Sequence, residues 1–204
     1  MSINVDIDFS KEALANIEDW RQKTANVVTG GEFNKSLAMA VKRAADHGKT
    51  RFKQSITSKY TAKSKTIAEL MRVVHIGGLG STRGSPSAEI RFQGSRLPIT
   101  DYFKVTPKSP AVQKGKVPSS RKRAVIEVLK GQKRPSRRAF VANLPVRGLR
   151  LYHRDKNTGK LRTRTGSSIV TMVDKDEVRD PAWNSVHRVL SERVDHEMKR
   201  LLNR

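Results

Sequence analysis

Residues 32–56, EFNKSLAMAVKRAADHGKTRFKQSI, decide the fold of this chain. Apolar or small residues recur there at steps of three or four, which places them on one face of an α-helix. This stripe consists of Phe33, Leu37, Val41, Ala44, Gly48, Phe52 and Ile56. Alanine and glycine leave little side-chain bulk in its middle, which would allow a second backbone to pack closely there. The alternative is that alanine occurs there simply because it is a strong helix former. The segment therefore predicts a long amphipathic helix that begins near Glu32.

Further helices are predicted on both sides of this segment. Ser10 is a suitable N-cap for a helix that runs towards a break at 29–31, and a short helical piece is expected over 63–71. Near the other end, Asp180 can cap a helix whose first position is Pro181. The apolar stripe of that helix is Trp183, Val186, Leu190, Val194, Met198 and Leu201. Helices are thus expected at both ends of the sequence.

Between the helices the hydrophobic period changes to that of β-strands. Six short segments rich in β-branched or aromatic residues are predicted strands: 72–76, 88–92, 99–105, 124–129, 149–153 and 169–173. Glycine and proline mark two mobile loops, 77–86 and 106–123, and the second is expected to order only on assembly. The predicted fold class is α+β, with N-terminal helices, a central antiparallel β-sheet or partial barrel with long basic loops, and a C-terminal amphipathic helix.

The 204 residues are expected to form one compact domain with three regions. They are an N-terminal helical region over 1–60, a basic β-rich core with long loops over 61–175, and a C-terminal helix over 176–204. The sequence has no cysteine, which excludes disulfides, thiolate metal sites and a cysteine nucleophile. It also has no signal-peptide pattern and no apolar run of about 18 residues, so neither export by a signal peptide nor a membrane span is expected.

Positive charge is concentrated in the middle of the sequence. The whole chain has 42 basic and 19 acidic side chains, which gives a net charge of +23. Residues 1–60 hold 10 basic and 7 acidic side chains, residues 61–170 hold 25 and 5, and residues 171–204 hold 7 and 7. Such a field attracts polyanions within a Debye length of about 8–10 Å, and nucleic acid is the obvious candidate. An acidic protein neighbour, or solubility alone, would also explain the charge.

The basic middle is expected to contact phosphates rather than to read bases. It offers few aromatic side chains beyond Phe140 and Tyr152 on which bases could stack. The basic residues predicted to face DNA or a protein partner are Lys114, Lys116, Arg121, Lys122, Arg123, Lys130, Lys133, Arg134, Arg137 and Arg138.

No catalytic constellation is found in the sequence. The five histidines never accompany a carboxylate at metal-ligand spacing, and His187 and His196 would lie about 180° apart on one helix. The glycine-rich stretch 77–85 lacks the residue order of a phosphate-binding loop. The acidic residues of the basic middle are Glu69, Glu89, Asp101, Glu127 and Asp155. They are spread along the chain, whereas a two-metal nuclease needs clustered carboxylates. We therefore expect no enzyme, no catalytic residue, no metal and no cofactor.

Four segments of the chain form a recognisable series. They are the alanine-rich basic helix 37–52, then RLPITDYF at 96–103, RRAFVA at 137–142 and LRLYHR at 149–154. In this order they resemble the bacteriophage minor tail protein Z family, whose members are tail completion proteins, from about Phe33 to the C-terminus. One corner departs from the family pattern. SIVTMV at 168–173 leads into an acidic linker, DKDEV, where the family has a glycine-proline-serine turn.

The resemblance implies a virion component that is assembled in the host cytoplasm and completes the tail at the head–tail junction. Its implied partners are further copies of itself in a homo-oligomeric ring, other phage neck, connector and tail proteins, and double-stranded DNA in the channel, bound without sequence specificity. Residues expected at packing contacts between subunits are Ala40, Ala44, Gly48, Trp183 and Leu190. The alternative is a stand-alone protein that binds nucleic acid without sequence specificity.

Overall fold

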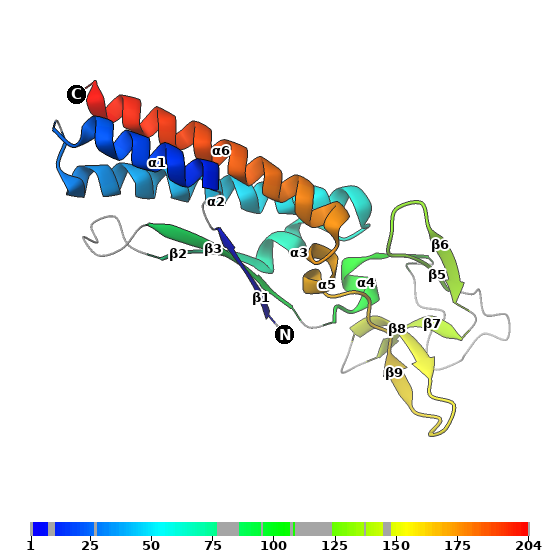
Figure 1. Ribbon diagram of the computed structural model, residues 1–204. Coiled ribbons are helices and arrows are strands. Elements are labelled where there is room, and N and C mark those ends of the chain that lie inside the picture. The colour runs from blue at the N-terminus through cyan, green and yellow to red at the C-terminus, as the bar shows by residue number, and fades with distance from the viewer. Residues whose placement is uncertain are drawn as a thin grey trace.

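A helical layer and three small sheets make up the computed structural model, which describes residues 2–7, 11–26, 28–76, 86–94, 96–106, 108, 124–136, 138–144 and 148–203. The helices are α1 (Lys11–Thr24), α2 (Gly30–Lys59), α3 (Ser64–Glu69), α4 (Ile99–Tyr102), α5 (Ile169–Val173) and α6 (Asp176–Leu202). The strands are β1 (Ser2–Ile7), β2 (Met71–Ile76), β3 (Ser87–Gln93), β4 (Lys104–Thr106), β5 (Ala124–Glu127), β6 (Lys133–Ser136), β7 (Ala139–Leu144), β8 (Gly148–Arg154) and β9 (Leu161–Thr163). Figure 1 shows α1, α2 and α6 in one layer above the sheet of β1, β2 and β3, with the remaining strands at one end.

The longest helix, α2, confirms the predicted amphipathic segment. A capping box closes its start: the Glu32 N–H donates to Thr29 Oγ1 at 3.4 Å, and the Thr29 N–H donates to Glu32 Oε2 at 3.3 Å. Every member of the predicted apolar stripe is buried. Because the cap lies at Thr29, the helix begins at Gly30, slightly before the predicted Glu32.

Three elements pack closely around Gly48 of α2. A Cβ at this position would lie 2.8 Å from Ile90 Cδ1 of β3 and 2.8 Å from Val186 Cγ2 of α6. Real Cβ atoms do not approach carbon atoms this closely, so glycine is what lets a strand and a helix contact α2 at the same point. The core of the helical layer is built around this contact.

Four of the five residues predicted at contacts between subunits are buried inside this helical layer. Ala40, Ala44 and Leu190 are fully buried, and Gly48 is buried with them. Trp183 is partly buried against the core. The structure therefore corrects the assignment of the first four to contacts between subunits, because their own chain already covers them. Small residues on one face of a helix predict that another backbone packs closely there. They do not indicate whether that backbone belongs to the same chain or to another subunit.

A buried carboxylate fixes α6 against α2. Glu197 of α6 is fully buried and forms an ion pair with Arg43 of α2. Arg200 Nη2 lies 2.9 Å from Glu197 Oε2, outside hydrogen-bond geometry but close enough for a second ion pair. A buried charge is tolerated when it is paired, and removing its partners is costly. Arg43 therefore sets where Glu197 can lie along α2, and Arg200 of α6 adds charge compensation from the same helix.

Helix α1 is held to α6 by a single carboxylate. Asp195 accepts hydrogen bonds from Asn16 Nδ2 and from Trp20 Nε1, both at 2.9 Å. Thr24 is buried, and its hydroxyl donates to the carbonyl of Trp20 at 2.8 Å. These bonds complete the helical layer of α1, α2 and α6.

The strands form three separate three-stranded antiparallel sheets, in the orders β1-β3-β2, β4-β5-β6 and β7-β8-β9. The first sheet packs against α2, where the rings of Phe52 and Phe92 meet edge to face with centroids 5.2 Å apart. The α+β class is confirmed, whereas the central sheet or partial barrel is wrong for the described residues. The reason is that α4 interrupts the chain after β3, and each later sheet pairs only consecutive strands. No described helix is long and apolar enough to cross a membrane.

Two predicted strands contain helices instead. Residues 169–173 form α5, because Ser168 Oγ caps the helix by accepting the Thr171 N–H at 3.2 Å. The apolar residues of α5 are buried, and a short apolar run does not distinguish a buried strand from a buried helix. Residues 99–102 form α4 directly after Pro98, and β4 follows it. The prediction over 99–105 is thus correct only at its end.

Helix α6 begins earlier than predicted. It starts at Asp176, so Asp180 is not its N-cap and Pro181 lies inside the helix. Asp176 and Glu177 place negative charge in the first turn, where the helix macrodipole favours it. Arg179 Nη2 and Nε bind Asp176 at 2.6 Å and Asp180 at 3.0 Å. Pro181 removes one backbone hydrogen bond from the helix, and the buried residues Val178 and Ala182 continue the helix on both sides of it.

The other predicted elements are confirmed as α1, α3, β2, β3, β5 and β8. The sequence prediction does not contain β1, β6, β7 or β9. Strands β6 and β9 are short and polar, and they are formed as hairpin partners after turns at Gly131 (φ +79°) and Gly159 (φ +64°). Ser10 and almost all of the predicted loops 77–86 and 106–123 lie outside the described residues.

Replacing Gly48 by alanine is expected to lower the free energy of unfolding. Overpacking of the core costs about 1–3 kcal/mol, while the better helix propensity of alanine returns about 1 kcal/mol. We expect a net loss of up to about 2 kcal/mol in chemical denaturation. Gly31→Ala is the matched control, because no atom lies within 4 Å of a Cβ built there. Equal effects of the two substitutions would contradict close packing at Gly48.

Candidate polyanion-binding site

A groove of about 830 Å³ lies between the β5–β6 hairpin and the segment that follows β9. We call it the sheet groove. Its basic lining residues are Arg96, Arg134, Arg164 and Lys175, and its hydroxyl-bearing ones are Tyr60, Ser136, Thr165, Ser167, Ser168 and Thr171. No aspartate or glutamate occurs among the described residues that line it. Cations and hydroxyl donors without acidic neighbours suit a ligand that carries phosphates.

Backbone pairing holds together the two segments that supply arginines to this groove. The Ile99 N–H donates to the carbonyl of Arg164 at 3.3 Å, and the Gly166 N–H donates to the carbonyl of Leu97 at 2.7 Å. A Cβ at position 166 would lie 2.5 Å from Cε2 of Phe103, so only glycine allows this approach. The arginines that flank these bonds are therefore placed in the groove by the backbone.

The cations of the sheet groove form no salt bridge with any acidic residue that the structure describes. Arg96, Arg134, Arg164 and Lys175 are exposed, and none forms a salt bridge within the part of the chain that the structure describes. Among these four cations, Arg134 donates a hydrogen bond from Nη2 to the neutral Gln132 Oε1 at 3.4 Å. Four like charges around one space raise the local potential and attract external anions.

A second groove of about 790 Å³, the lysine groove, has Lys63, Lys104, Lys108 and Lys130 in its lining. Glu127 is the one acidic side chain among its described lining residues. Neighbouring residues of β5 line different grooves: Glu127 lines the lysine groove, and the residues before and after it line the sheet groove. Because successive side chains of a strand point to opposite faces, the two grooves lie on opposite faces of this small sheet.

The carboxylate of Glu127 forms its hydrogen bond within the β5–β6 hairpin and lies beside Lys104. It is buried, and its Oε1 accepts the Gly131 N–H at 2.9 Å, while its Oε2 lies 3.6 Å from Lys104 Nζ. The bond from Gly131, followed by the charges of Lys104 and Lys133, lowers the pKa of this carboxyl below its ordinary value of 4.5. Glu127 thus closes the turn and neutralises part of the lysine charge beside it.

The structure brings only some of the predicted basic residues together. Lys130 lines the lysine groove, Arg134 lines the sheet groove, and Lys133 and Arg138 are exposed nearby in the sequence. The remaining predicted basic residues lie outside the described part of the chain: Lys114, Lys116, Arg121, Lys122, Arg123 and Arg137.

Three cations of the sheet groove, Arg96, Arg164 and Lys175, are absent from the predicted set. Arg96 lies in the segment that resembles the phage family, and it has no acidic residue within four positions, which is a usable signal. Lys175 stands between Asp174 and Asp176, so the sequence suggests a neutral neighbourhood. Only the turn from α5 into α6 brings its side chain to the groove.

Three of the five acidic residues of the basic middle have separate contacts. Glu89 is buried and pairs with Arg91 Nε at 2.8 Å, and Asp101 is exposed and accepts a hydrogen bond from the hydroxyl of Thr100 at 3.2 Å. Glu127 belongs to the hairpin turn. Among the described residues no group of three or more histidine, aspartate or glutamate side chains could hold a metal ion.

Comparison with known proteins gives no family model, no curated protein and no solved structure that matches the chain. The two grooves and the four segments at 37–52, 96–103, 137–142 and 149–154 are therefore the features that bear on function.

Replacing Glu127 by glutamine is expected to lower the melting temperature at pH 7. The folded state lowers the pKa of this carboxyl, so its stabilisation is present above the ordinary value of 4.5 and is lost as the pH falls through the folded value. The difference between the two proteins should therefore narrow as the pH is lowered from 7 towards 2, measured by thermal unfolding. Glu69→Gln, an exposed change on α3, is the control. A difference that stays constant with pH would contradict the ionised turn contact.

Proposed function

We propose that this chain is a structural protein of a tailed-phage virion, a tail-completion or neck subunit that forms a ring at the head–tail junction around the DNA channel. The observation that carries the proposal is the sheet groove, where four cations surround one space and no acidic residue lines it in the described part of the chain. The groove supports contact with DNA, and the four-segment resemblance supports the place in the virion.

The side chains of the sheet groove suit phosphate oxygens. Its three arginines present planar, fork-shaped donors that match phosphate geometry, and its hydroxyl groups add neutral donors. Tyr60 is the one aromatic residue among the described lining residues, and only 8% of it is exposed, so it is no platform for stacking bases. Binding through such a groove is independent of sequence, as a channel for passing DNA requires.

The distribution of charge supports a subunit with two kinds of neighbour. The regions that contain the helical layer, 1–60 and 171–204, have almost equal numbers of acidic and basic side chains, while residues 61–170 carry most of the excess. A nearly neutral surface suits contacts with proteins, and a strongly basic one suits contact with DNA. We therefore assign the helical layer to other copies of the chain and to neighbouring neck, connector and tail proteins.

A stand-alone protein that binds nucleic acid without sequence specificity is the second candidate. It is favoured by the core, because the chain buries Gly48, Leu190 and the rest of the α2–α6 contact without a second subunit. The same sheet groove would serve this protein equally well. The two candidates differ in assembly rather than in the chemistry of DNA contact.

Removing the charges of the sheet groove is expected to weaken binding to a duplex of random sequence. The variant combines Arg96→Gln, Arg134→Gln, Arg164→Gln and Lys175→Gln. Each lost phosphate contact reduces the slope of log K against log salt by about 0.9, so the slope should become shallower by about 3 to 4. Fluorescence anisotropy over a series of salt concentrations measures this slope.

The matched control removes four exposed charges from the helical layer: Lys35→Gln, Lys42→Gln, Arg193→Gln and Lys199→Gln. Both variants lose the same net charge, so only their position differs. The control should keep nearly the whole slope. If both variants lose it equally, total charge rather than the groove binds DNA, and the proposal loses its supporting observation.

A further inference from the structure

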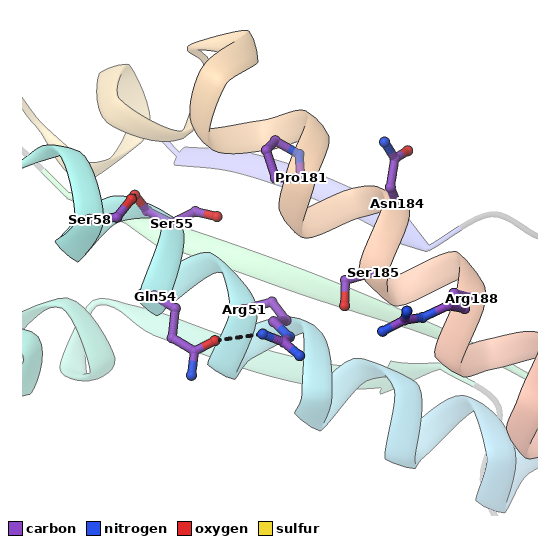
Figure 2. Close-up of a pocket in the computed structure, with 8 residues that line it drawn as sticks. All are labelled: Arg51, Gln54, Ser55, Ser58, Pro181, Asn184, Ser185 and Arg188. Atoms are coloured by element: carbon purple, nitrogen blue, oxygen red, sulfur yellow. Dashed lines mark hydrogen bonds between the residues drawn. The ribbon is translucent and has the colours of Figure 1, made fainter.

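A third groove, the helix groove, lies between α2 and α6 and has a volume of about 590 Å³. Figure 2 shows its eight lining residues, four from each helix. Pro181 alone lacks a side-chain hydrogen-bonding group, and none of the eight is acidic. The groove is thus a polar space between two helices, separate from the grooves of the β4–β5–β6 sheet.

Two arginines from different helices line this groove. In Figure 2 the side chain of Arg188 extends from α6 towards α2, and the guanidinium group of Arg51 lies on the α2 side, joined to Gln54 by a hydrogen bond. Arg51 forms no salt bridge within the described part of the chain. Arg188 Nε lies 3.8 Å from Glu192 Oε1, and both side chains are about two-thirds exposed, so this pair is weak. Two positive charges therefore share one space with little compensation.

Neutral side chains hold Arg51 in this orientation. Its Nε donates to His47 Nε2 at 3.2 Å, and its Nη1 donates to Gln54 Oε1 at 3.1 Å. Nε2 can accept this bond only while the imidazole is uncharged. Ser185 Oγ lies 3.0 Å from the same nitrogen, so the serine is positioned by the same ring. Donors of Arg51 that these bonds leave free remain available to a ligand.

We propose that the helix groove binds a phosphate group through Arg51 and Arg188, with the neighbouring Ser55 and Asn184 as neutral donors. Two guanidinium groups match the charge of a phosphate dianion, whereas a single carboxylate would neutralise only one of them. The shared chemistry is that of a phosphate monoester or free phosphate. This site goes beyond the proposed function and does not rest on it, because it shares no lining residue with the sheet groove, which is assigned to DNA.

Binding should be visible at His47. Burial first, and then the charges of Arg51 and Arg188, lower the pKa of this imidazole. Glu192 raises it and Arg193 lowers it further, to a smaller extent. A bound anion stabilises the imidazolium, so phosphate should raise the pKa of His47 relative to chloride.

The experiment titrates the full chain with inorganic phosphate at constant ionic strength, set with chloride, and follows binding by calorimetry and by the NMR signals of the histidine rings. The His47 signal should shift and its pKa should rise, while the signal of His75, which is exposed on β2, stays unchanged. Arg51→Gln and Arg188→Gln should each weaken binding about tenfold or more, since each removes a charged hydrogen-bond donor. The side chain of Arg188 is 67% exposed, so its replacement tests binding without risk to the fold.

Arg72→Gln is the matched control, because it removes the same charge from an exposed position of β2 outside the groove. It should leave phosphate affinity unchanged within about twofold. A second arm with a nucleoside 5′-monophosphate identifies the source: tighter binding than inorganic phosphate indicates an organic monoester, and equal binding indicates free phosphate. No binding of phosphate, no change at His47, or equal losses in Arg72→Gln and Arg188→Gln would each overturn the proposal.

Discussion

The contact of α2 with α6 and β3 at Gly48 is the constraint on which the rest of the structure depends. With a Cβ 2.8 Å from Ile90 Cδ1 and from Val186 Cγ2, a larger residue would require these buried side chains or the elements that carry them to shift. The contact places the first sheet under α2 and sets α6 beside it. Glu197 then fixes the position of α6 along α2 through Arg43, and Asp195 fixes α1 on top. The packing at Gly48 and these polar contacts thus position the three helices relative to one another.

Most of the excess positive charge of the chain lies outside this helical layer, in residues 61–170. The β4–β5–β6 sheet has a groove on each face, and the cations in both grooves outnumber the one described acidic residue, Glu127. The hairpin bond to Gly131 holds that carboxylate in place. Positive charge therefore surrounds both faces of this small sheet, while residues 1–60 and 171–204 are nearly balanced. This division suits a part that contacts nucleic acid on one side and proteins on another.

Periodicity was enough to predict α2, because its stripe runs unbroken over many turns and every member is buried. It failed for α5, where a short apolar run has the same composition as a strand and the cap at Ser168 decides. It also failed for β6 and β9, since polar hairpin strands follow from their turns rather than from an apolar pattern. The concentration of charge was predictable from composition. The sheet groove was not, because backbone pairing and the turn into α6 bring its cations together from remote segments.

The central claim is that copies of this chain assemble into a ring around DNA. Size-exclusion chromatography with light scattering tests it most directly, on the full chain alone and with a short duplex. The account predicts one closed oligomer whose mass is a fixed multiple of 22.9 kDa. A monomer at every concentration, which still binds DNA as single subunits, would contradict it.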